Sequence, residues 1–231
     1  YIGEWRETRR NVRYPSITFW TFRHGGLRVG FDGYQEVRAL YHQDHPPTPA
    51  RSAPTLPKSS SNDQPNYTRN RQRLLETWRC SVPLNHPKAA PARNYLHHRG
   101  LGELIDRHDL PATVLRCGPM LAYWDTGDDK KPYLLGRFPA LVAAIQAPND
   151  DKATALHRTY LQPDGNGKAD VPSAKKLMPP ARPNALTGAA VRLYPYGTKL
   201  AVAEGIETAL AIRLATGLPV WSAVSAFGLS H

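Results

Sequence analysis

Glu204, near the C-terminal end of the sequence, is the residue whose type and position most suit chemistry. Glu204 follows the short apolar run Leu200–Ala203, and Glu207 lies three residues later, at the start of an amphipathic segment. An apolar run that ends in Glu-Gly before a helix is typical of a parallel strand whose C-terminal end carries a carboxylate, where open α/β sheets bind ligands. A carboxylate in that position suits a divalent metal ion or a general acid–base role.

The elements that must position these two glutamates are a strand, a helix and a second strand. The apolar run Val220–Val224 comes after Gly217-Leu-Pro219, where a helix that starts after Gly205 is expected to end. The segment from Leu200 onward therefore predicts a βαβ unit. Glu207 would lie in the first turn of its helix, where a negative charge also stabilises the helix dipole, so both interpretations of Glu207 stay open.

The segment before residue 200 predicts mixed α and β structure. Expected helices are Arg69–Cys80, with Leu74, Leu75 and Trp78 on one face, then Ala92–His98 and Leu101–His108; expected strands are Val114–Cys117, Ala122–Trp124, Phe138–Gln146 and Ala153–Leu161. The run Ala140–Gln146 suits a buried helix as well as a strand, and the flanking prolines Pro139 and Pro148 favour a strand. Alternation in Thr154–Leu161 predicts one buried and one solvated face. The polar runs 125–129 and 164–168 predict turns.

The N-terminal part of the sequence is basic and contains a long linker. Apolar residues alternate from Ile17 on both sides of Gly25-Gly26, which predicts a β-hairpin, and Val37–His42 suits a strand or a short helix. The run Gln43–Asn66 is rich in proline and serine and predicts a disordered linker. The net charge is +11, and most of the excess lies before residue 101, which favours an anionic partner such as nucleic acid.

Five segments, in this order, give the sequence a resemblance to the bacterial-type DNA primases of phages, plasmids and integrated elements. They are Ala92-Arg-Asn-Tyr-Leu-His-His-Arg-Gly-Leu101, Gly136-Arg137, His157-Arg-Thr-Tyr-Leu161, Ala174-Lys-Lys-Leu177 and Glu204-Gly-Ile-Glu-Thr-Ala-Leu210. The first four are similar to segments of the primase core. The last resembles the first motif of the Toprim domain, which primases share with topoisomerases and some nucleases.

The resemblance implies template-directed synthesis of short RNA primers, a nucleotidyl transfer that depends on Mg²⁺ or Mn²⁺. It implies a catalytic and metal-associated role for Glu204 and a place in the metal site for Glu207. It further implies that four cations hold template or nucleotide phosphates, namely Arg137, Arg158, Lys175 and Lys176. The expected partners are single-stranded DNA, nucleotides and a replicative helicase.

The expected architecture is α+β with an α/β end, in four parts. These are a basic β-rich segment (1–42), the linker (43–68), a primase-core-like subdomain (69–195) and an incomplete Toprim domain (196–231). No Asp-x-Asp follows Glu204, so half of the family's metal site is missing and this chain is expected to be inactive on its own. Two functional alternatives stay open: a DNA-cleaving Toprim nuclease or topoisomerase-like enzyme, and a non-catalytic single-strand-binding module.

The remaining composition predicts a cytoplasmic protein without a zinc ribbon. Cys80 and Cys117 are far apart and form no Cys-x-x-Cys motif, which a zinc ribbon needs. The sequence has no apolar run of about 18 residues, so no membrane span is expected. It opens without a basic-then-apolar leader, so no secretory signal is expected.

Overall fold

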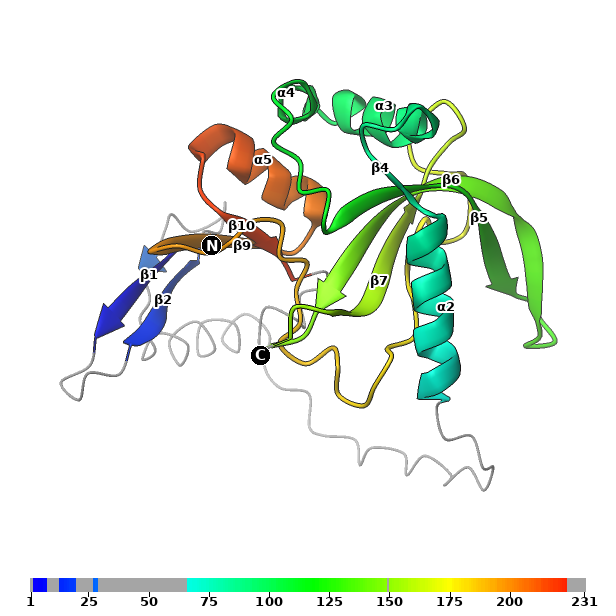
Figure 1. The fold of residues 1–231 in the computed structure, drawn as a ribbon, viewed down its shortest axis with the longest axis horizontal. Coiled ribbons are helices and arrows are strands. Elements are labelled where there is room, and N and C mark those ends of the chain that lie inside the picture. The colour runs from blue at the N-terminus through cyan, green and yellow to red at the C-terminus, as the bar shows by residue number, and fades with distance from the viewer. Residues whose placement is uncertain (1, 8–12, 20–26, 29–65, 149, 224–231) are drawn as a thin grey trace. The chain divides into compact units, whose positions relative to one another are not determined.

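The computed structural model describes residues 2–7, 13–19, 27–28, 66–148 and 150–223 (Figure 1). The chain divides into two compact units. The first comprises residues 1–66 together with 198–200, and the second comprises residues 67–197 and 201–231. The candidate site residues all belong to the second unit.

Residues 2–28 of the first unit include, in their described part, three antiparallel strands. They are β1 (Ile2–Glu7), β2 (Arg13–Phe19) and β3 (Leu27–Arg28). Phe19 of β2 pairs with Leu27 of β3, which confirms the predicted hairpin. The expected element at Val37–His42 and all but the last residue of the expected linker at Gln43–Asn66 lie outside the described residues.

The second unit begins with helix α2 (Tyr67–Cys80), which confirms the helix expected at Arg69–Cys80. Leu74 is buried and Trp78 is partly buried against the core, as expected of the apolar face. Leu75 is 39% exposed, so its place on that face was predicted wrongly. Consecutive residues of a helix are about 100° apart, and only Leu74 points directly at the sheet.

Four short elements follow α2. They are strand β4 (Val82–Pro83), the 3₁₀ helix η1 (Pro87–Ala89), helix α3 (Ala90–His98) and helix α4 (Gly102–Asp106). The two α-helices confirm those expected at Ala92–His98 and Leu101–His108. Gly100 adopts a φ of 75° between them, a left-handed conformation that glycine enters without strain.

A five-stranded antiparallel sheet forms the centre of the second unit. Its order is β4-β5-β6-β7-β8, and its longer strands are β5 (Leu115–Thr126), β6 (Pro132–Gln146), β7 (Ala153–Tyr160) and the short β8 (Lys175–Leu177). In Figure 1, α2 runs beside β7, while α3 and α4 lie above the strands. Asp164 accepts a hydrogen bond from the Asn166 backbone at 3.0 Å, which confirms the turn predicted at 164–168. The turn predicted at 125–129 is confirmed in part, because Asp125 and Thr126 belong to β5 and the turn follows at Gly127, where Asp129 accepts a hydrogen bond from the Lys131 backbone at 3.0 Å.

The interpretation of Ala140–Gln146 as a strand is confirmed, but the solvated face expected for β7 is wrong. Strand β6 runs through Pro139, whose carbonyl accepts a hydrogen bond from the Leu161 amide at 2.8 Å. Six of the eight residues of β7 are buried, because helices cover the sheet on both sides of this strand. Alternate side chains do point to opposite faces, yet neither face is solvated.

The last described residues of the chain form the predicted βαβ unit. Strand β9 (Lys199–Ala203), helix α5 (Ile206–Thr216) and strand β10 (Val220–Ser222) follow one another, and β10 pairs with β9 in parallel. Gly217 ends α5 with a φ of 69°, as its position predicted. A short segment joins this unit to the main sheet, since Ala190 pairs with Gln146 of β6 and Val191 pairs with Ser222 of β10.

The fold class is therefore α+β, with a mostly antiparallel sheet and one parallel strand pair. The buried core includes Cys117, whereas Cys80 is exposed. Burial raises the pKa of the Cys117 thiol to about 11. Among the described residues, no helix has the length and apolar character needed to cross a membrane.

Candidate functional site

Glu204 directly follows β9, which ends at Ala203, and lies two residues before α5, which begins at Ile206. Gly205 caps α5 in an extended conformation, with φ −103° and ψ 150°, so the chain turns from strand to helix directly after the glutamate. The Glu204 side chain is exposed, and its backbone carbonyl accepts a hydrogen bond from Ser222 Oγ of β10 at 3.0 Å. The carboxylate thus stands in solvent at the C-terminal end of two parallel strands.

Glu207, one turn further on, is instead held inside the protein by two partners. Tyr95 Oη of α3 donates a hydrogen bond to Oε1 at 2.8 Å, and Lys175 Nζ of β8 lies 3.1 Å from Oε2. Burial alone would raise the pKa of Glu207. Hydrogen bonds from its own backbone, Tyr95 and Lys175, with the charge of Lys175, outweigh that effect and hold the pKa below its ordinary value. Burial and then Glu207 raise the pKa of Tyr95.

The two glutamates therefore differ in their fit to a divalent metal ion. Mg²⁺ typically takes one or two carboxylates and keeps several waters, so the exposed Glu204 carboxylate fits as one ligand. Each oxygen of Glu207 already accepts a hydrogen bond, and Lys175 offsets its charge, so Glu207 fits a metal ion less well. Among the described residues, no group of three or more histidine, cysteine or acidic side chains is placed to hold a metal ion.

His157 of β7 lies close to the same cluster and was given no role by the sequence. It is 7% exposed, and its Nδ1 has no hydrogen-bond partner in the described structure. Burial, followed by the positive charge of Lys175, lowers its pKa to about 4, although Glu207 acts in the opposite direction. His157 is thus a neutral side chain that the fold keeps next to an ion pair.

Arg158 and Lys176 lie on the other face of the sheet. They are direct cross-strand neighbours, and Lys175 is paired with Thr159 one position along. Because successive strand residues point to opposite faces, Lys175 reaches Glu207 while Lys176 faces the α2 side. The four cations expected to bind phosphate are therefore divided between the two faces.

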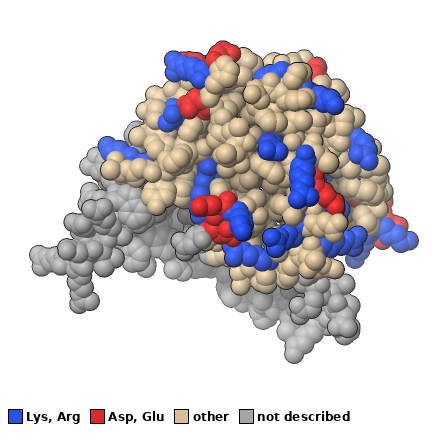
Figure 2. Space-filling view, in the orientation of Figure 1, with Lys and Arg blue, Asp and Glu red and all other residues tan. Residues whose placement is uncertain are grey.

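A cavity of about 400 Å³, which we call the α2 pocket, contains Arg158 and Lys176. Its other lining residues are Arg69, Asn70, Arg73, Trp124, Pro132, Met178 and Pro179. Lys176 Nζ lies 3.9 Å from the centre of the Tyr123 ring and 3.5 Å from Asp125 Oδ1. Figure 2 shows lysine and arginine side chains gathered around the position that α2 has in Figure 1.

Arg137 is separate from both groups. It is an exposed residue of β6 paired with Ala122 of β5. Strand alternation places it on the face of Leu141, which is the face that bears Lys175 rather than Lys176. Among the described residues, no hydrogen bond or ion pair engages its guanidinium.

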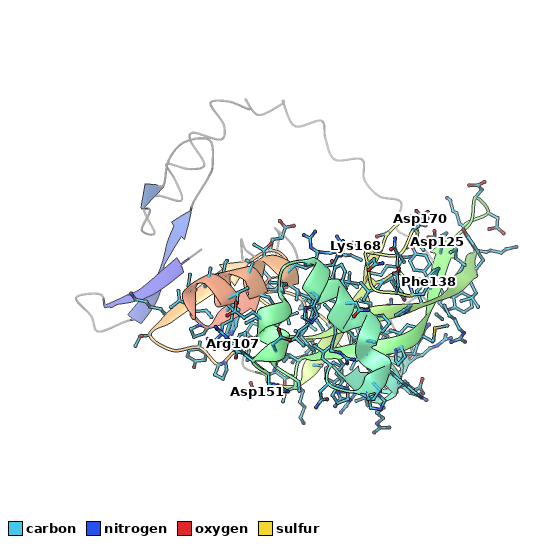
Figure 3. The ribbon with its side chains drawn as sticks, turned by 90° about the horizontal axis from the view of Figure 1, so that it is seen from above. Arg107, Asp125, Phe138, Asp151, Lys168 and Asp170 are labelled. Atoms are coloured by element: carbon cyan, nitrogen blue, oxygen red, sulfur yellow. The ribbon has the colours of Figure 1, made fainter. Side chains whose placement is uncertain are left out.

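A second cavity, of about 470 Å³, lies elsewhere in the unit and differs in charge. It is lined by several aromatic residues, including Tyr194 and Trp221, and by two carboxylates that are each paired with arginine. Asp151 Oδ1 lies 3.2 Å from Arg192, and Asp109 Oδ2 lies 2.9 Å from Arg213. The two cavities share no lining residue, so this cavity is distinct from the α2 pocket, and Asp151 is well apart from Asp125 in Figure 3.

Sequence reasoning missed Tyr95, His157, Arg69, Arg73 and Trp124 as site residues. The arginines had a usable signal, because positions 69 and 73 are one helical turn apart in an expected helix. Tyr95 is 112 residues from Glu207 and had no such signal.

Comparison with protein families matches residues 68–188 to a domain of unknown function, DUF7146. No curated protein matches the chain, and no solved structure matches it.

Proposed function

The chain belongs to the DUF7146 family, which is defined by a domain of unknown function, and we propose that it is a DNA primase-like protein with a Toprim-type βαβ unit, acting in the replication of a mobile element. The observation that carries the proposal is the exposed carboxylate of Glu204 at the C-terminal end of the parallel pair β9–β10, directly before α5. An exposed carboxylate at such an edge suits a metal-dependent transfer of phosphoryl or nucleotidyl groups.

In this proposal Glu204 supplies a carboxylate to a Mg²⁺ or Mn²⁺ ion, which neutralises phosphate charge when bound. Glu207 instead fixes the start of α5 against α3 and β8 through Tyr95 and Lys175. Arg158 and Lys176 contact phosphates on the α2 side. The proposal implies a cytoplasmic protein whose partners are single-stranded DNA, nucleotides and a replicative helicase.

A metal-binding experiment on this chain tests the role of Glu204. Mn²⁺ broadens NMR signals of nearby nuclei, so we expect loss of the Ala203 and Gly205 amide signals on titration. Glu204→Gln should abolish this loss. Glu103→Gln is the matched control, since it removes an exposed carboxylate on α4. Equal broadening in the wild type and Glu204→Gln would exclude Glu204 as the ligand.

The activity test is incorporation of labelled ribonucleotides into short primers on single-stranded circular DNA with Mg²⁺. It is run with the protein as its gene encodes it. Glu204→Gln is expected to abolish synthesis without changing thermal unfolding. Cleavage of DNA in the same reaction would favour the alternative of a Toprim nuclease or topoisomerase-like enzyme.

A non-catalytic single-strand-binding module is the second candidate, and the pairing of Glu207 with Lys175 favours it. Because Glu207 is paired with Lys175 and hydrogen-bonded to Tyr95, Glu204 is the one of these two glutamates that is available to bind a metal ion. Binding of single-stranded DNA that is equally strong with EDTA, with Mg²⁺ and in Glu204→Gln, without primer synthesis, would select this candidate.

A further inference from the structure

The α2 pocket collects positive charge from three elements. Arg69 and Arg73 come from successive turns of α2, Arg158 comes from β7, and Lys176 comes from β8. No carboxylate lines the cavity itself, although Asp125 lies 3.5 Å from Lys176 Nζ and partly offsets its charge. In the described structure, the charges of the second cavity are balanced by ion pairs, whereas Arg73 and Arg158 make none.

This concentration of charge is unfavourable without an anion. Burial, and then the proximity of Arg73, lower the pKa of Arg158, which means that its charged form is destabilised. Its guanidinium lies over the Tyr160 ring at 5.5 Å, and its Nε is buried without a hydrogen-bond partner in the described structure. A bound phosphate would supply both the missing negative charge and an acceptor.

Trp124 adds a flat aromatic surface to the same cavity. Its side chain is 48% exposed, an unusual state for so large an apolar group, and it lies beside Pro132, Met178 and Pro179. Unpaired bases stack on such rings with about 1–3 kcal/mol per base. Phosphate-binding cations next to an exposed indole suit a nucleotide whose base is unpaired and can stack on the ring. The bases of a duplex are paired and are not accessible for such stacking.

Other basic residues of α2 lie outside the cavity. Arg71 and Arg79 are exposed on the same helix, but at about 100° per residue Arg71 points away from the side that bears Arg69 and Arg73. Figure 2 shows the basic side chains as a group wider than one residue. Four cations around one cavity fit successive phosphates of a strand better than a single phosphate group.

We propose that the α2 pocket binds single-stranded nucleic acid, with its cations on the phosphates and Trp124 stacked on a base, on the sheet face opposite to Glu207. This site deepens the proposed function by locating its strand-binding surface. Its test uses EDTA and therefore needs no metal ion, so failure here and failure of the Glu204 experiment are separate results.

The test is fluorescence anisotropy of a labelled oligo-dT of about 12 nucleotides, in EDTA at several salt concentrations. Arg73→Gln should weaken binding about five- to tenfold and reduce the slope of log K against log salt by about 1. Trp124→Ala should weaken binding about tenfold, the equivalent of losing one stacked base. Residues 1–65 are the same in every variant, so their contribution cancels.

Arg107→Gln is the matched control, because it removes the same charge from an exposed site. Arg107 is well apart in Figure 3 from Asp125, the partner of Lys176. It should change affinity less than twofold. Equal losses in Arg73→Gln and Arg107→Gln would overturn the proposal, because they would indicate diffuse attraction by net charge.

Two competitors distinguish the source of the phosphate. Unlabelled oligo-dT should displace the probe, whereas ATP and tripolyphosphate should do so only at much higher concentration. If the affinity for ATP fell in Arg73→Gln and Trp124→Ala while oligo-dT did not bind, the site would be a nucleotide pocket and the strand-binding proposal would be wrong. Equal affinity for duplex DNA would likewise overturn it. Circular dichroism and thermal unfolding check that each variant is folded.

Discussion

Lys175 and Lys176 are adjacent in β8, yet their ammonium groups serve opposite faces of the sheet. Lys175 Nζ lies 3.1 Å from Glu207 Oε2, whereas Lys176 Nζ lies 3.9 Å from the centre of the Tyr123 ring. The first lysine binds the βαβ unit to the sheet, and the second lines the α2 pocket. Because consecutive strand residues point to opposite faces, Lys175 forms an ion pair on one face while Lys176 lines the α2 pocket on the other.

Tyr95→Phe is expected to lower the free energy of unfolding by about 1–2 kcal/mol, because it removes a hydrogen bond to a half-buried, charged carboxylate. Urea unfolding at pH 7 measures the effect. In the background of Glu207→Gln the same substitution should lose much of its effect, since the partner is no longer charged. Additive losses in the double variant would show that the two side chains do not interact.

Glu204→Gln and Glu207→Gln should differ in stability although the residues are three positions apart. Glu204 is exposed, so its substitution should change the free energy of unfolding by less than about 0.5 kcal/mol. Glu207→Gln should cost about 1 kcal/mol or more, since it removes the charge that Tyr95 and Lys175 contact. Thermal unfolding of the two variants side by side measures this, and equal loss would contradict the distinction.

His157 should make the protein less stable as the pH falls from about 6.5 to about 4. Its pKa is about 4 in the folded protein and 6.5 ordinarily, so in this range the unfolded chain binds a proton that the folded chain does not. The full shift corresponds to about 3 kcal/mol. Urea midpoints at pH 7, 5.5 and 4.5 should fall less in His157→Gln than in the wild type.

The exposed His98 supplies the control for that measurement. His98→Gln should retain the wild-type dependence of stability on pH. A slope that is unchanged in His157→Gln would mean that other groups cause the acid sensitivity. Glu207 contributes separately and at lower pH, because its lowered pKa gives a stabilisation that is lost as the pH falls below the ordinary carboxyl range.

Gly165→Ala should destabilise the protein more than Gly217→Ala. Both glycines have a positive φ, 80° and 69°, so each alanine is strained by about 1 kcal/mol. A Cβ at residue 165 would also lie 2.2 Å from the Pro91 carbonyl oxygen, whereas at residue 217 it would meet nothing within 4 Å. Chemical denaturation measures both variants, and equal losses would show that the loop before β8 relaxes freely.

The βαβ unit could be predicted from sequence because its signals are local. Gly205 and Gly217 delimit α5, and apolar runs of strand length lie on either side. Strand β6 was harder, since Ala140–Gln146 fits two structures, and its extension from Phe138 back to Pro132 had no local signal. A proline in a strand is tolerated where its missing N–H is not needed, and only the pairing shows where that is.

Single residues of the candidate site could be predicted from the sequence, but not which of them lie close together in the structure. Glu204 ends its strand where the pattern indicated. Lys175 and Lys176 were treated as one set, although the period of two in a strand separates them. The neighbours of Glu207 could not be predicted at all, because Tyr95 and Lys175 come from elements far away in the sequence, and only the tertiary fold brings them to one carboxylate.

The unequal burial of the two cysteines makes this chain convenient to label. Maleimides react with thiolates, and Cys117 is buried with a pKa raised to about 11, so it is protected at neutral pH. Cys80 is exposed at the last residue of α2. A fluorophore or spin label added to the unmodified sequence will therefore attach at the end of the helix whose other turns line the α2 pocket, and it will report on whatever strand is brought there.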